Sequence, residues 1–179
     1  LEVTDVLPKD GSVDIATDAA ITVIFNRPVV PLVSSEDAAA LPSPITISPE
    51  VVGTGEWLNT AIYVFRPEPG FAGGSQYTVT VNPDLAAQDG ATLQAPYSWS
   101  FSTVEPMVVE VNPQAQATGI LLTDSVQVKF NQAVDHASAE AAFSLTDTGT
   151  NTAVEGAFEC AEDSTGFRFI SAESLKIDT

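Results

Sequence analysis

The sequence predicts an all-β protein that consists of two tandem β-sandwich domains. Apolar residues alternate with polar residues along several short segments, and this period of two is typical of strands that bury one face. Segments near the N-terminus also return later in the chain, as when Phe25-Asn26 recurs as Phe130-Asn131, 105 positions further on. A repeat of about 100 residues has the size of a β-sandwich domain, whereas solenoid and propeller repeats are only about 20–50 residues long.

The repeat sets the domain boundaries that we expect. We assign residues 1–104 to the first domain and residues 105–179 to the second. The second copy is shorter by roughly 30 residues than a domain of this type requires, so we expect it to be truncated at its C-terminus. Missing strands would leave an unpaired sheet edge, which favours an edge-strand dimer. The matched positions are Pro8 and Pro113, Ile15 and Ile120, Ile21 and Val126, Val23 and Val128, Phe25 and Phe130, and Val29 and Val134.

The repeated strands show which of their faces is buried. Ile21, Val23 and Phe25 alternate with other residues and predict one inward face. In the second copy Lys129 takes the place of Ile24. Because an unpaired lysine is rarely buried, this intervening position is expected to face solvent.

Further strands follow the same pattern. Residues 63–65 (Tyr-Val-Phe) align with residues 167–169 (Phe-Arg-Phe), so we expect the aromatic side chains to face the core and the middle residue to face away. Residues 77–81 and 97–101 alternate almost without error and are rich in β-branched and aromatic residues. Both segments are therefore predicted as well-buried strands.

Helix is scarce in this sequence. Ala-rich stretches at residues 34–40 and 137–142 follow the two Phe-Asn pairs and predict helices of one to two turns. Ser34 or Ser35 would cap the first of them. Gly, Pro and Asp residues predict turns between the strands, at residues 9–11, 67–70, 72–74 and 88–90.

The acidic composition excludes two classes of partner. Of 179 residues, 24 are Asp or Glu and only 6 are Lys or Arg, which gives a net charge of −18. This charge opposes binding to nucleic acids and to anionic lipid surfaces, because both depend on cationic side chains. The acids are spread evenly along the chain, which is typical of a solvated surface. No apolar run approaches the ~18 residues of a membrane span, so no membrane-spanning segment is predicted.

No constellation of residues predicts catalysis. The one cysteine, Cys160, alternates with Phe158 on a predicted strand and is interpreted as a small buried hydrophobic residue, with a reactive thiol as the alternative. The one histidine, His136, follows a turn and is expected on the surface. No second His or Cys completes a metal cluster, and no Ser lies in a Gly-x-Ser-x-Gly context. We therefore predict no catalytic, cofactor or metal site and no enzyme activity.

Two further groups have alternative interpretations. Asp84 and the Asp89-Gly90 pair could supply oxygen ligands to calcium, but no EF-hand spacing is present and the cluster is more simply a turn. Trp99 belongs to an alternating strand and is expected in the core. Trp57 is interpreted either as a packing residue or as a platform on which a sugar ring could stack.

Several motifs together resemble the bacterial Ig-like domain of the SbsA type, over residues 3–103 in full and 108–179 in part. They are an early Val-x-Pro, a strand ending Phe-Asn-x-x-Val, then Tyr-x-Phe-x-Pro, Tyr-Thr-Val-Thr-Val, an Asp-Gly turn and a closing Trp-Ser-Phe-Ser-Thr. Within the first copy the sequence also resembles the N-terminal region of bacterial α2-macroglobulins. The segments concerned are residues 25–32 (Phe-Asn-Arg-Pro-Val-Val-Pro-Leu), 45–49, 55–60 (Gly-Glu-Trp-Leu-Asn-Thr) and 63–67. The resemblances imply tandem Ig-like (macroglobulin-like) β-sandwich domains.

The macroglobulin resemblance implies a large protease trap that is secreted, periplasmic or lipid-anchored, in which a bait segment is cut and a thioester captures the attacker. The thioester motif of that family reads Cys-x-Glu-Gln, whereas this chain has Cys160-Ala161-Glu162-Asp163. Asp has no side-chain amide to condense with the thiol, so Cys160 is not assigned this role. The implied function is a non-catalytic scaffold from the N-terminal part of the inhibitor. Its partners would be the other domains of the parent protein and, through the intact parent, target proteases.

Other hypotheses come from different classes of protein. Ig-like modules of this type occur in many architectures, so a spacer or stalk of a bacterial cell-surface or S-layer protein is the alternative. A carbohydrate-binding module that uses Trp57 is a third hypothesis. All three place the protein at the cell surface, in the periplasm or outside the cell.

Overall fold

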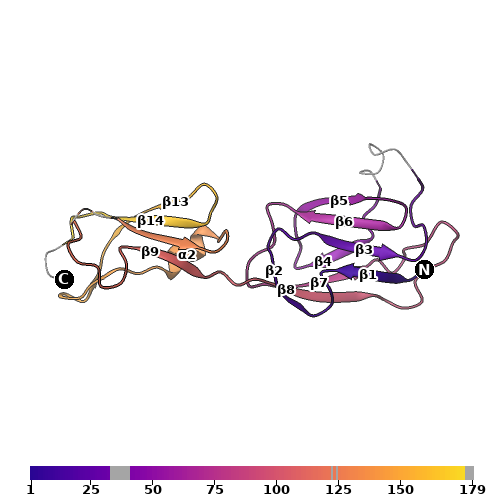
Figure 1. The fold of residues 1–179 in the computed structure, drawn as a ribbon, viewed down its shortest axis with the longest axis horizontal. Coiled ribbons are helices and arrows are strands. Elements are labelled where there is room, and N and C mark those ends of the chain that lie inside the picture. The colour runs from indigo at the N-terminus through magenta and orange to yellow at the C-terminus, as the bar shows by residue number, and fades with distance from the viewer. Residues whose placement is uncertain (33–40, 122, 124, 176–179) are drawn as a thin grey trace. The chain divides into compact units, whose positions relative to one another are not determined.

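The computed structural model describes residues 1–32, 41–121, 123 and 125–175. The chain divides into two compact units, Leu1–Glu105 and Pro106–Thr179, called unit 1 and unit 2 below. The predicted all-β class is confirmed, because nearly all regular structure in the described residues is strand (Figure 1). Each unit is described by itself.

Unit 1 is a sandwich of two four-stranded sheets (Figure 1). The first sheet is antiparallel, with the strand order β1 (Val3–Leu7), β3 (Ile21–Phe25), β6 (Ile62–Pro67), β5 (Gly53–Trp57). The second has the order β2 (Ser12–Ile15), β8 (Ser98–Thr103), β7 (Gln76–Val81), β4 (Ile45–Ser48), and its β2–β8 pair is parallel.

The core of unit 1 lies between these two sheets. The side chains of Ile21 and Val23 on β3 and of Val79 and Val81 on β7 are 0% exposed, and Phe101 on β8 is 1% exposed. The predicted inward faces of these strands are therefore confirmed. Burial of apolar surface contributes about 25 cal/mol per Å², which makes this face-to-face contact the main source of stability.

Aromatic side chains fill both ends of this core. Trp57 on β5 packs against Phe25 and Tyr63, with ring centroids 6.0 and 5.3 Å away. Phe71, which follows β6, packs against Tyr77 and Phe101 at 4.8 and 5.3 Å. Such tilted and edge-on aromatic pairs stabilise a core beyond the area that they bury.

Unit 2 has one four-stranded antiparallel sheet with the order β13 (Gly156–Cys160), β14 (Gly166–Ser171), β10 (Val126–Phe130), β9 (Val108–Asn112). Its register repeats that of the first sheet of unit 1. Val126 lies opposite Phe169 just as Ile21 lies opposite Phe65. The described part of this unit also contains a short hairpin of β11 (Thr146–Asp147) and β12 (Thr152–Ala153).

The short helix predicted at residues 137–142 is confirmed as α2 (His136–Ala142). Asp135 caps its N-terminus, because the Asp135 carboxylate accepts a hydrogen bond from the Ser138 backbone N–H at 2.9 Å. The other helix, predicted at residues 34–40, lies outside the described residues.

A small aromatic cluster forms the core of unit 2. Phe143, just after α2, packs against Phe158, Phe167 and Phe169 with centroid separations of 5.6, 5.4 and 4.9 Å. Gly156 on β13 lies under the Phe169 ring, where an added Cβ would collide with it. Among the described hydrophobic residues of unit 2, only Phe167 and Phe169 are buried, with exposures of 7% and 4%.

Thr103 ties the end of β8 to the loop that precedes β7. It is 3% exposed, its hydroxyl donates to the Ala72 carbonyl at 2.6 Å, and its Oγ1 accepts from the Ser75 N–H at 3.0 Å. Replacing it with an isosteric apolar side chain would leave two polar backbone groups without partners.

We expect Thr103→Val to lower the free energy of unfolding of unit 1 by about 1–3 kcal/mol, the usual cost of an unsatisfied buried polar group. The matched control is Thr78→Val on β7, whose side chain is exposed and should tolerate the change. Urea denaturation followed by tryptophan fluorescence measures both, since both tryptophans lie in unit 1. Equal midpoints for the two variants would contradict the role given to the hydroxyl.

Candidate functional site

Cys160 lies at the end of β13, opposite Phe167 on β14, and is half-buried. Its Sγ donates to Oε1 of Glu140 on α2 at 3.6 Å. Burial raises the pKa of the Cys160 thiol, and the hydrogen bond and charge of Glu140 raise it further. A raised pKa favours the protonated thiol, which is a poor nucleophile and a poor metal ligand. The position agrees with the interpretation of Cys160 as a small packing residue.

His136 begins α2 and is half-buried, so the expectation of a surface residue needs correction. Its Nε2 atom is buried without a hydrogen-bond partner. The turn before it, which suggested exposure, is the N-cap of a helix that packs its first residue inward.

The Asp89-Gly90 pair forms a closed turn. Asp89 Oδ1 accepts from the Ala91 N–H at 3.1 Å, and its other carboxylate oxygen pairs with the Arg27 guanidinium at 2.6 Å. These partners, the Ala91 hydrogen bond first, hold the pKa of the Asp89 carboxyl below its usual value. Asp84 is exposed nearby in the sequence. The contacts of Asp89 therefore agree with the interpretation of this cluster as a turn.

Both tryptophans are packed inside unit 1. Trp57 is 6% exposed, and its Nε1 donates to the Pro42 carbonyl at 3.2 Å. Trp99 is 2% exposed, and its Nε1 is buried without a partner. Stacking on a sugar needs an open ring face, which neither residue presents. For Trp57 the packing interpretation holds.

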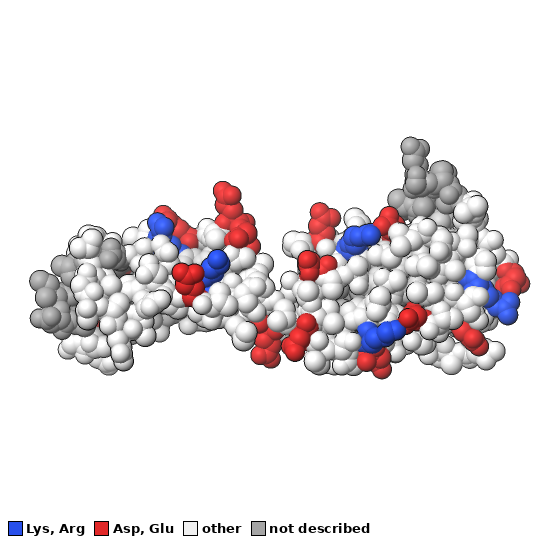
Figure 2. Space-filling view, viewed as in Figure 1, with Lys and Arg blue, Asp and Glu red and all other residues white. Residues whose placement is uncertain are grey.

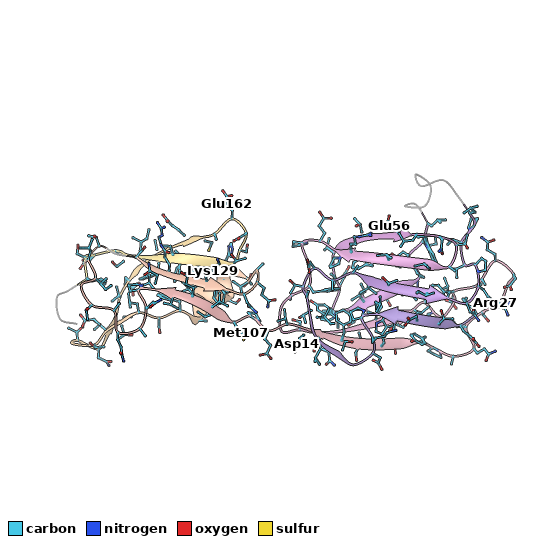
Figure 3. All side chains as sticks on the ribbon, in the orientation of Figure 1. Asp14, Arg27, Glu56, Met107, Lys129 and Glu162 are labelled. Atoms are coloured by element: carbon cyan, nitrogen blue, oxygen red, sulfur yellow. The ribbon has the colours of Figure 1, made fainter. Side chains whose placement is uncertain are left out.

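The outer face of the unit 2 sheet carries a shallow depression of about 480 Å³ that the sequence did not reveal. Lys129 on β10, which Figure 3 labels, and Arg168 on β14 line this depression together with Glu110, Glu159 and Asp163, and all five are exposed. Arg168 lies 4.0 Å from Glu159. Exposed charges of opposite sign neutralise one another, and each exposed ion pair contributes little to the free energy of unfolding. This surface is therefore typical of a solvated sheet face. Cross-strand register brings these charges together, which is why spacing along the chain does not show them.

The acidic side chains do not converge on one place. Figure 2 shows Asp and Glu in small separate groups on the visible face of each unit. Among the described residues, no three His, Cys, Asp or Glu side chains are arranged to hold a metal ion. In the same part of the chain, no helix is both long and apolar enough to cross a membrane.

Comparison with known structures finds several matches of low identity. An L,D-transpeptidase from Mycobacterium smegmatis is 18% identical with a TM-score of 0.39, over 89% of this chain and 60% of that protein. L,D-transpeptidase 3 from Mycobacterium tuberculosis is 17% identical with a TM-score of 0.39, over 97% and 78% of the two chains. Domains 5–6 of the S-layer protein SbsC are 16% identical with a TM-score of 0.27, over 98% and 86%. The chain spans less than two thirds of the first of these proteins, and similarity at this level supports no functional assignment.

Comparison with protein families is more specific. No curated protein matches the sequence. The family described as Bacterial Ig-like domain matches twice, over residues 1–103 and 102–179, and so covers both halves of the 105-residue repeat. The two sheets of unit 1 and the register that unit 2 shares with it agree with this match. The chain therefore belongs to the bacterial Ig-like domain family and carries two tandem copies of that domain.

Proposed function

We propose that this chain is a non-catalytic structural segment from the N-terminal part of a bacterial α2-macroglobulin-like protease inhibitor that works at the cell surface, in the periplasm or outside the cell. The bacterial Ig-like domain is a non-catalytic module. The observation that carries the proposal is the resemblance of residues 25–32 and 55–60 to the N-terminal region of bacterial α2-macroglobulins.

The macroglobulin parent rests on the sequence resemblance of two segments that the fold brings together. The Val29 N–H, after β3, donates to the Thr60 carbonyl, in the β5–β6 turn, at 2.7 Å. Trp57, at the start of the same turn, lies inside the core. The segments at residues 25–32 and 55–60 are thus hydrogen-bonded to each other in unit 1.

A spacer or stalk of a cell-surface or S-layer protein is the second candidate. Tandem repetition favours it, because two copies of one domain follow each other within 179 residues. In this role the domains set a distance and present no binding site of their own. The two candidates differ in what the rest of the parent protein contains.

The intact parent should inhibit a protease and be cut within a bait segment, whereas residues 1–179 alone should do neither, since the trapping parts lie elsewhere. Inhibition is measured as the protease activity that remains on a protein substrate. Cleavage of the bait segment is measured by gel electrophoresis of the parent. A parent that is not cut and does not inhibit the protease would contradict the macroglobulin proposal. A long series of further Ig-like copies in that parent would then favour the stalk.

Cys160 should react slowly with iodoacetamide at pH 8. Its raised pKa leaves less thiolate than free cysteine has at the same pH. Glu140→Gln should speed the reaction, because it removes a negative charge that disfavours the thiolate. Glu159→Gln, on β13 with its side chain toward Arg168, is the matched control and should change little. Mass spectrometry over time gives the rates, and a wild-type rate equal to that of free cysteine would overturn the assignment.

Tryptophan emission should stay unchanged when the chain is titrated with a panel of bacterial polysaccharides, because Trp57 and Trp99 are both buried. The control is a titration with the small quencher acrylamide. Acrylamide should quench the emission more strongly when the chain is unfolded in urea, because both rings are then accessible. A saturable change in emission with any polysaccharide would restore the sugar-binding hypothesis.

A further inference from the structure

The chain enters and leaves unit 1 at opposite ends of its sandwich (Figure 1). It enters through β1 in the first sheet and leaves through β8 in the second. The strands run between the same two ends, so a pull on the two ends of the unit is directed along them. The resistance to such a pull depends on which strands connect the point of entry to the point of exit.

The pair formed by β2 and β8 is the last connection between these two points. β2 follows β1 in the chain and pairs directly with β8. If a pull detaches β1 from β3, only residues 1–11 are drawn out before the load reaches β2. The remainder of the unit stays closed until β2 and β8 separate, because it lies between these two strands in the sequence.

The parallel direction of this pair determines how its hydrogen bonds share the load. Ser12 lies opposite Phe101 and Ile15 lies opposite Thr103, so both strands run the same way. The load acts on the start of β2 and on the end of β8, which are opposite ends of the pair. The strands must then slide past each other, and all hydrogen bonds between them carry the load at once. A load applied at one end of a pair would instead open the bonds one after another.

Hydrogen bonds extend this pair beyond both of its ends. Before β2, the Gly11 N–H donates to the Ser100 carbonyl at 2.8 Å, and Oδ1 of Asp10 accepts from the Ser100 N–H at 2.9 Å. After β8, the Val104 N–H donates to the Ile15 carbonyl at 2.9 Å. Each of these three bonds joins the β2 segment to the β8 segment, so each adds to the load that the pair can withstand.

The point of exit is also fastened on its other side. The Thr103 N–H donates to the Ser75 carbonyl at 3.0 Å, and the Gly74 N–H donates to the Val104 carbonyl at 2.8 Å. β8 is therefore held between β2 and the segment before β7 up to its last residue. This double attachment opposes peeling of the end of β8 from the sheet.

The point of entry has a fastening that both copies of the domain share. The Glu2 N–H donates to Oδ1 of Asn26, and the Asn26 N–H donates to the Glu2 carbonyl, both at 3.0 Å. In unit 2, Met107 and Asn131 form the same two bonds at 2.8 and 3.0 Å. The repeat thus reproduces a reciprocal bond at the residue where the chain enters each domain.

We propose that unit 1 is a load-bearing module in which the parallel β2–β8 pair, extended by Asp10, resists tension along the chain. The pair keeps residues 12–103 folded while tension acts on both ends of the unit. This role belongs to unit 1 itself and does not depend on which of the two candidate parents carries it.

The test holds single molecules of residues 1–179 at a constant force between handles at the two chain ends. Unfolding of unit 1 is recognised by its length, because residues 12–103 span roughly 300 Å when extended at about 3.4 Å per residue. Unit 2 is the shorter unit and gives a smaller step. The lifetime before the larger step measures the unfolding rate, which governs resistance to force.

A second chain changes the direction of the load. Its first handle is attached through a Ser48→Cys substitution at the exposed end of β4, and both chains carry Cys160→Ala. β4 and β8 are each antiparallel to β7, so the ends of β4 and β8 lie at the same end of the second sheet. The load then opens the bonds singly. At the same force the lifetime of unit 1 should be at least about fivefold shorter, which is the effect of one hydrogen bond.

Asp10→Ala should shorten the lifetime about fivefold when the chain is pulled at its two ends, because one hydrogen bond is lost from the loaded pair. Asn59→Ala is the matched control. Oδ1 of Asn59 accepts from the Ala61 N–H at 2.8 Å, and this bond lies within one exposed turn outside the loaded pair. The control should lower the free energy of unfolding in urea to a similar extent and leave the lifetime under force unchanged.

Two results would overturn the proposal. One is an equal lifetime of unit 1 in the two load directions, which would show that the parallel pair does not bear the load. The other is an equal lifetime of the Asp10→Ala and Asn59→Ala chains under end-to-end force, which would reduce Asp10 to an ordinary contribution to stability.

Discussion

The requirement that an apolar sheet face be covered governs both halves of this molecule. In unit 1 two such faces pack against each other, and Ile21, Val79 and Phe101 are therefore only 0–1% exposed. In unit 2 one face of the same design is covered by fewer buried side chains, with Phe143 packed against Phe167 and Phe169. The same strands with the same register then keep part of their apolar surface in contact with solvent, because half-burial follows from the cover and not from the strands.

The sequence predicted β3, β6, β7 and β8 because each of these strands carries a local signal. The alternation of apolar and polar residues in β3, β7 and β8 is visible within each strand. The constant offset of the repeat then locates the matching strands in the second copy. The helix α2 was also predictable, since an Ala-rich stretch after an Asp cap is a local pattern.

What the sequence did not show depends on contacts between distant segments. The Cys160–Glu140 pair joins β13 to α2, and the mixed charges around Arg168 meet across strands. The half-burial of His136 at the start of α2 was not indicated by the turn that precedes it. Such features need the fold as a whole, and no spacing of residue types along the chain encodes them.

The four closest ion pairs have a consequence for how copies of this protein meet one another. Within the described part of the chain, Lys9, Arg27, Arg66 and Arg168 each lie within 4.0 Å of a carboxylate. Four of the six Lys and Arg residues are thereby paired, and most of the other Asp and Glu residues that the structure describes are exposed. Neighbouring copies then repel one another over about 10 Å at 0.1 M salt. In a crowded layer of such copies, the spacing between neighbours would therefore widen at low ionic strength and narrow at high ionic strength.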